Sequence, residues 1–175
     1  LALEDREFGH ARALFEGALA VNEHSPRAWI GLGLADLADG KAAKAAGQLD
    51  RGAGQFGDHL GSWIAAGWAW LLSGDRAKAR ERFEHALAID PNFGEAQGSL
   101  AMIEMLEGQA DAAKRRADVA SRLDRNAFSA ALVHALLNAG AGNADAAQRI
   151  VEKALNQPIG AGGRTIAEVL ARLAR

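Results

Sequence analysis

The sequence contains no cysteine, which excludes disulfide bonds and thiol chemistry. The absence leaves the compartment open, so cytoplasm and periplasm both fit and no localisation is predicted. An excess of one charge is also lacking, because 20 Lys and Arg are spread among 22 Asp and Glu, for a net charge of −2. Nucleic-acid binders usually carry a strongly basic face, so this balance argues against nucleic acid as a partner.

The chain has no long hydrophobic run. The uncharged stretch Leu60–Gly74 is strongly apolar, but it includes serine and glycine. It also falls short of the ~20 apolar residues that a helix needs to cross a bilayer, so we expect no membrane insertion. The first residue is leucine and not methionine, and we therefore expect a fragment or a processed form of a longer protein.

Motifs that carry catalysis or bind metals are missing as well. The five histidines show no HxxxH or HExxH spacing, so no helical face presents two metal ligands. No GxSxG nucleophile motif occurs, and Gly160–Gly163 lacks the Lys-Ser/Thr of a phosphate-binding loop. The sequence therefore predicts no catalytic residue, no metal site and no cofactor, in a protein that is not an enzyme.

What the sequence does contain is an internal repeat with a constant period of 34. The interval is kept by four glycines and by five alanines: Gly40, Gly74, Gly108 and Gly142, and Ala11, Ala45, Ala79, Ala113 and Ala147. A fixed interval of this length indicates one supersecondary unit copied along the chain, and such units build solenoids. The repeats cover residues 26–59, 60–93, 94–127 and 128–157.

Each repeat predicts a helix, a tight turn and a second helix. The repeated glycine lies between two helical patterns, where it can end the first helix with a positive φ at no steric cost. Asp75 and Asn143 each follow such a glycine and are predicted N-caps of second helices. The first helices are expected over residues 26–39, 60–73, 94–107 and 128–139, and the second helices over 42–55, 76–89, 110–123 and 143–156.

Small residues recur where the two antiparallel helices of a repeat would touch. One such position holds Gly33, Gly67, Ala101 and Ala135, and another holds the repeated alanines from Ala45 to Ala147. A larger side chain at either position would push the helix axes apart. The pattern thus predicts hairpins whose backbones come close together.

The sequence resembles the tetratricopeptide repeat family over residues 7–156. The repeat from 60 matches nearly every signature position, with Trp63, Gly67, Trp70, Gly74, Ala79, Phe83, Ala86 and Pro91. The repeat from 128 is the weakest, because Ala131 and His134 stand where tryptophan and leucine are usual. The resemblance implies an all-α, right-handed superhelical solenoid of antiparallel helix–turn–helix repeats.

We expect a single solenoid domain over residues 1–175. At its start, residues 7–21 match the second helix of a repeat whose first helix is almost entirely missing. At its end, residues 158–163 predict a turn-rich break, and residues 164–175 have the pattern of a short amphipathic helix that caps the array.

The resemblance places a candidate site on the first helices, whose inner faces line a concave groove in this family. The corresponding positions are commonly polar in the family but apolar here: Ile30, Leu34, Leu37, Ile64, Trp68, Leu71, Met102, Met105, Leu132 and Leu136. Three explanations stay open. Packing within the superhelix covers these residues, or they form a groove for a peptide with Trp68 as its anchor, or they form a self-association surface.

Together with the resemblance, this pattern predicts a non-catalytic scaffold that binds an apolar or amphipathic segment of another protein. The alternatives are a homo-oligomerisation module and an accessory domain of a larger enzyme or of a secretion or assembly machine. The clamp with which chaperone-tail-binding members hold a terminal carboxylate is not expected, because its positions hold Ile30, Leu34, Ala65, Glu95 and Ser99. The high content of alanine, glycine and arginine is typical of a bacterial source.

Overall fold

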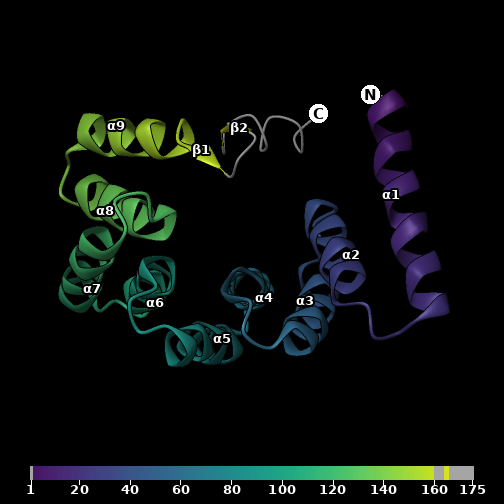
Figure 1. The fold of residues 1–175 in the computed structure, drawn as a ribbon. Coiled ribbons are helices and arrows are strands. Elements are labelled where there is room, and N and C mark those ends of the chain that lie inside the picture. The colour runs from purple at the N-terminus through teal and green to yellow at the C-terminus, as the bar shows by residue number, and fades with distance from the viewer. Residues whose placement is uncertain (1, 160–163, 166–175) are drawn as a thin grey trace. The chain divides into compact units, whose positions relative to one another are not determined.

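The computed structural model describes residues 2–159 and 164–165, which fold into helices joined by short turns (Figure 1). The chain divides into two compact units, Leu1–Asp90 (unit 1) and Pro91–Arg175 (unit 2). Unit 1 holds α1 (Ala2–Val21), α2 (Pro26–Ala38), α3 (Ala42–Phe56), α4 (Leu60–Leu72) and α5 (Arg76–Ile89). Unit 2 holds α6 (Gly94–Leu106), α7 (Ala110–Leu123), α8 (Phe128–Gly140), α9 (Ala144–Leu155), β1 (Pro158–Ile159) and β2 (Arg164–Thr165).

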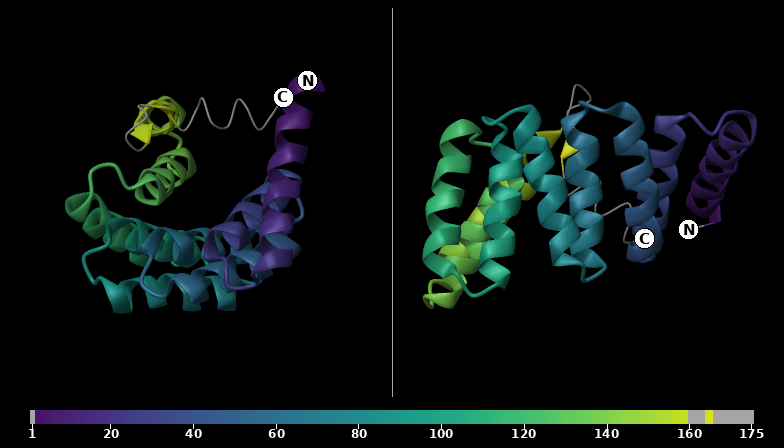
Figure 2. Two further views of the ribbon diagram at one scale, coloured as in Figure 1. Left: turned by 45° about the vertical axis from the view of Figure 1, so that its right-hand side comes forward. Right: turned by 90° about the horizontal axis from the view of Figure 1, so that it is seen from below.

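The helices from α2 to α9 form four hairpins, two in each unit. In unit 1, α2 packs on α3 and α4 on α5, and in unit 2, α6 packs on α7 and α8 on α9. Figure 2 shows the two helices of each hairpin side by side. Every helix end in these hairpins lies within one residue of the range expected from the repeat. That the two units act as one domain stays a prediction.

The turn inside each hairpin is set by the repeated glycine. Gly40, Gly74, Gly108 and Gly142 have φ between 75° and 91°, the left-handed region that glycine adopts without strain. In the first of these turns the amide of Lys41 donates to the carbonyl of Asp36 at 2.8 Å, as in a Schellman motif. The other three turns contain the same bond, which closes each first helix in the same way.

The two predicted N-caps differ in the structure. The Asp75 side chain accepts a hydrogen bond from the Lys78 amide at 3.0 Å and caps α5 as predicted. Asn143 occupies the N-cap position of α9, but its side chain makes no capping hydrogen bond. The N-cap position predicted for Asn143 is therefore confirmed, but its side chain does not supply the hydrogen bond of a side-chain cap.

Both ends of the array differ from expectation. The helix expected over residues 7–21 is α1, which begins at Ala2 and packs on α2. At the other end, Arg164 and Thr165 form β2, which pairs antiparallel with β1. The expected capping helix over residues 164–175 thus does not begin at Arg164, and the rest of that prediction lies outside the described residues.

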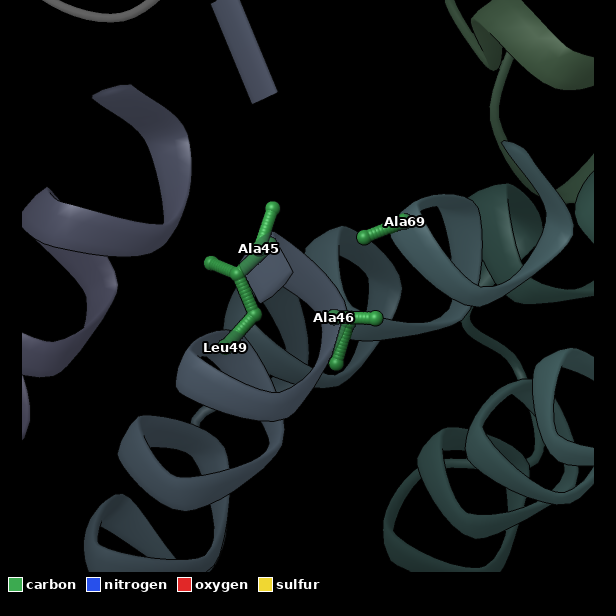
Figure 3. Close-up of a cluster of buried hydrophobic side chains, with 5 residues drawn as sticks. Ala45, Ala46, Leu49 and Ala69 are labelled. Carbon is green, nitrogen blue, oxygen red and sulfur yellow. The ribbon is translucent and has the colours of Figure 1, made fainter. Parts of the chain in front are cut away.

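The core of unit 1 is built largely from alanine and glycine. Ala45, Ala46 and Leu49 of α3 gather with Ala69 of α4 and are all inaccessible to solvent (Figure 3). In the next hairpin the ring of Phe83 lies so close to Gly67 that a Cβ there would overlap it. Small residues therefore bring the helix axes together, and one larger side chain per hairpin fills the space between them.

In unit 2 the first helices of the two hairpins, α6 and α8, also approach each other closely. At Gly98 of α6, an added Cβ would lie 2.6 Å from the backbone nitrogen of Ala130 in α8. Ile103 on α6 and Val133 on α8, which follow Gly98 and Ala130 along these helices, are fully buried. No helix in the described part of the chain combines the length and the low polarity needed to span a bilayer.

Candidate peptide-binding surface

In unit 1 the apolar residues of the first helices divide between surface and core. Leu34 on α2 is 49% exposed, whereas Ile64 on α4 is only 9% exposed and belongs to the core. Ile30 and Leu37 are partly buried and pack against the alanine-rich cluster between α3 and α4. Leu71 on α4 is partly exposed. Leu34 is therefore the most accessible of these five side chains.

Trp68, the predicted anchor of the groove, is only partly accessible. Its ring centroid lies 6.0 Å from that of Phe83 on α5, with the two rings edge to face. Aromatic pairs in this geometry stabilise a fold beyond the area that they bury. Trp68 thus helps to hold α4 on α5, and its replacement would disturb this packing together with any surface role.

In unit 2 the division is similar. Met102 on α6 is 4% exposed and belongs to the core, whereas Met105 is partly exposed. On α8, Leu132 is partly buried and Leu136 is 40% exposed. We therefore leave Met102 and Ile64 out of the candidate surface, because a ligand cannot reach them without moving neighbouring side chains.

Two exposed residues of the first helices were missed in the sequence. Leu72 at the end of α4 is 64% exposed, and Leu106 at the end of α6 is 45% exposed. They stand one full repeat apart, since both occupy the same position of successive repeats. This register is the signal that could have identified them.

A fully buried carboxylate in unit 1 joins three helices. Asp36 on α2 accepts a hydrogen bond from Arg12 of α1 at 2.7 Å, and the Nζ atom of Lys44 on α3 lies 2.9 Å from its other oxygen. Burial acts to raise the pKa of Asp36, but the bonds from Lys44 and Arg12 outweigh it and hold this pKa below its usual value. These charged groups form a structural salt-bridge cluster that links α1 to the first hairpin.

A second carboxylate, in unit 2, caps a helix of the following repeat. Glu95 on α6 accepts the Ser129 amide of α8 at 3.3 Å and also accepts the Ser129 hydroxyl. Ser99 lies 3.1 Å from the same hydroxyl oxygen and must donate to it, because Ser129 has only one hydroxyl hydrogen. Burial raises the pKa of Glu95, and the bonds from Ser129 offset only part of this effect.

Asp36 and Glu95 each join helices through their hydrogen bonds and ion pairs. In the part of the chain that the structure describes, no three histidine or carboxylate side chains come together as metal ligands. On the described first helices, the most exposed large apolar side chains are Leu34 and Leu72 in unit 1 and Leu106 and Leu136 in unit 2.

Residues 71–140 match the model of the family described as tetratricopeptide repeat. The match runs from the end of α4 to the end of α8 and includes the turns at Gly74 and Gly108. Residues 71–140 therefore carry tetratricopeptide-repeat sequence. No curated protein matches the sequence at a significant level.

Solved structures show the same tetratricopeptide-repeat fold. TTC0263, a thermophilic repeat protein of Thermus thermophilus, is 20% identical and has a TM-score of 0.67, with 99% of this chain and 95% of that chain covered. MamA is 18% identical with a TM-score of 0.66, and the shares covered are 87% and 89%. YrrB is 18% identical with a TM-score of 0.61, and the shares are 86% and 78%. The predicted all-α fold of antiparallel helix–turn–helix repeats is confirmed.

Proposed function

We propose that this chain is a non-catalytic scaffold that binds another protein by docking an apolar or amphipathic peptide segment onto its first helices. The observation that carries the proposal is the exposure of Leu34 on α2 and Leu136 on α8, at 49% and 40%. Both stand at the same position of their repeats. Leu72 on α4 and Leu106 on α6 add one more exposed leucine to the first helices of each unit, so each unit presents apolar side chains of its own.

The fold supports a polypeptide as the ligand. Tetratricopeptide repeats form protein–protein interaction scaffolds, and YrrB is described as such a protein with an unusual peptide-binding site. Burying one exposed leucine under a peptide contributes roughly 1.5–3 kcal/mol before the costs of association are subtracted. Several such contacts, less those costs, correspond to an affinity in the micromolar range.

The proposal is tested with peptides selected from a random displayed library on the wild-type protein. Their affinity is then measured for Leu34→Glu and Leu136→Glu, and for the control Leu123→Glu. Leu123 is 41% exposed, almost as much as Leu136, but it lies on the second helix α7. We expect at least about a tenfold loss of affinity with either first-helix variant and little change with the control.

Two results would overturn the proposal. One is an equal loss with Leu123→Glu, which would show non-specific adhesion to any exposed leucine. The other is light scattering that shows a mass rising with concentration in the wild type but not in Leu34→Glu, which would assign the surface to self-association. Circular dichroism of each variant shows that helix content is retained.

A further inference from the structure

Two tryptophans of unit 1 sit in closely similar surroundings, one repeat apart. The indole nitrogen of Trp29 donates to the carbonyl of Glu23 at 2.9 Å, and that of Trp63 donates to the carbonyl of Gly57 at 2.6 Å. In both cases the acceptor precedes the tryptophan by the same interval and lies in the segment before the first helix. The repeat thus provides a fixed acceptor for an indole N–H.

The same two rings are each contacted by one residue of the second helix. The guanidinium carbon of Arg51 lies 4.2 Å from the ring centroid of Trp29. The His85 ring lies 4.2 Å from that of Trp63. Arg51 and His85 are again one full repeat apart, so this contact also belongs to the repeat. The carbonyl acceptor, the indole ring and the second-helix side chain therefore form one arrangement that recurs with the repeat.

In the last repeat of unit 2, the positions of this arrangement hold no tryptophan. The residue of α8 that corresponds to Trp63, two repeats later, is Ala131. The corresponding acceptor residue is Arg125, and the residue that corresponds to His85 is Lys153. All three line one hollow of about 220 Å³ between α7, α8 and α9. Its remaining walls include Ala127, Ile150, Ala154 and His134.

We propose that this hollow binds the indole ring of a tryptophan supplied by a partner polypeptide. Its volume is sufficient, since an apolar cavity of about 150 Å³ can admit benzene. Lys153 supplies a cation next to the ring, which tryptophan binds better than other aromatic side chains do. The carbonyl of Arg125 corresponds to the acceptors that hold the indole nitrogens of Trp29 and Trp63. Unit 2 has no tryptophan of its own to occupy the site.

The site is separate from the proposed peptide-binding surface. It is lined by none of the exposed leucines Leu34, Leu72, Leu106 and Leu136. Either proposal can therefore fail while the other stands.

The probe is N-acetyl-L-tryptophanamide, titrated into the full chain while backbone amide shifts are followed by NMR. We expect saturable shifts centred on Ala127, Ala131 and Ala154, and no comparable shifts with N-acetyl-L-leucinamide. Ala131→Trp places the chain's own indole in the hollow and should abolish binding. The control Ala110→Trp adds the same side chain at an exposed alanine of α7 and should leave binding unchanged.

Lys153→Ala tests the cation directly and should weaken binding about two- to fivefold. If Ala131→Trp does not fold, Ala131→Leu blocks the hollow with a smaller side chain and should also abolish binding. The proposal is overturned if the tryptophan probe shifts no amides around Ala131. It is equally overturned if leucinamide binds as well, or if a folded Ala131 variant still binds the probe.

Discussion

Helices α4 and α8 begin equivalent hairpins in unit 1 and unit 2, but they join the preceding hairpin differently. Within the preceding hairpin, α4 packs against α3. There Trp70 donates to Asp50 of α3 at 2.9 Å, and Arg82 of α5 binds both oxygens of the same carboxylate. α8 packs against both α6 and α7. In unit 1 the junction thus involves one helix of the preceding hairpin and adds a tryptophan and a bidentate ion pair, whereas in unit 2 it involves both helices of the preceding hairpin.

A single repeat position accounts for much of this difference. Gly98 of α6 lets the backbone of α8 come close, whereas the corresponding residue of α2 is Ile30, whose side chain lies over Gly52 of α3. The N-terminal capping of α4 and α8 also differs. His59 caps α4 from the adjacent residue, and Glu95 caps α8 from a full repeat earlier. Equivalent helices of the repeat are therefore capped in one case by the adjacent residue and in the other by a residue of the previous repeat.

The largest expected effect comes from closing the space at Gly98. Gly98→Ile should lower the free energy of unfolding by about 3 kcal/mol or more, because the new side chain meets backbone atoms of α8 that cannot move aside. Urea unfolding followed by circular dichroism measures the change. Gly47→Ile is the matched control, since Gly47 on α3 has no atom near its added Cβ. An equally small effect at both glycines would contradict the close approach of α6 and α8.

An intermediate effect should separate the two caps. Ser129→Ala removes three hydrogen-bond contacts of a buried serine hydroxyl, one of them to the Glu95 carboxylate, and should cost about 1.5–3 kcal/mol. Ser62→Ala removes the hydroxyl contact with His59 and should cost about 0.5–1.5 kcal/mol. Both values come from the same unfolding experiment. A larger loss for Ser62→Ala would show that the local cap is the stronger of the two.

The smallest effect is one of pH, and its sign should differ between the units. The pKa of Asp36 is lowered by folding, so its stabilisation is complete above the ordinary aspartate value of about 3.9 and is lost as pH falls. The pKa of Glu95 is raised, so stability from this group falls as pH rises from the ordinary glutamate value of about 4.3.

Asp36→Asn and Glu95→Gln isolate these contributions when unfolding free energies are measured across pH. The difference in unfolding free energy between the wild type and Asp36→Asn should shrink below about pH 4. Above about pH 4.3, the unfolding free energy of the wild type should fall relative to that of Glu95→Gln. Slopes of the same sign for the two variants would show that one of the two carboxylates has been misassigned.

Much of the fold could be predicted because its signals are local or one repeat apart. Gly40 and Gly74 end their helices by their own backbone freedom, and Asp75 caps the helix that it precedes. The exposure of the candidate surface residues was harder to predict. Leu34 and Met102 occupy the same repeat position, yet one is 49% exposed and the other 4%. Exposure depends on which neighbouring helices cover a residue, and the hydrophobic pattern of one helix does not contain this information.

The sequence by itself determined the eight hairpin helices of the described region, their turns and their small-residue contacts. These follow from interactions between residues within one repeat, where spacing along the chain fixes spacing in the helix. Only the tertiary structure decided that Glu95 caps α8, that Ile64 lies in the core, and that Ala131 leaves a hollow. Each of these depends on how closely neighbouring helices approach, which is set by side chains on several elements at once.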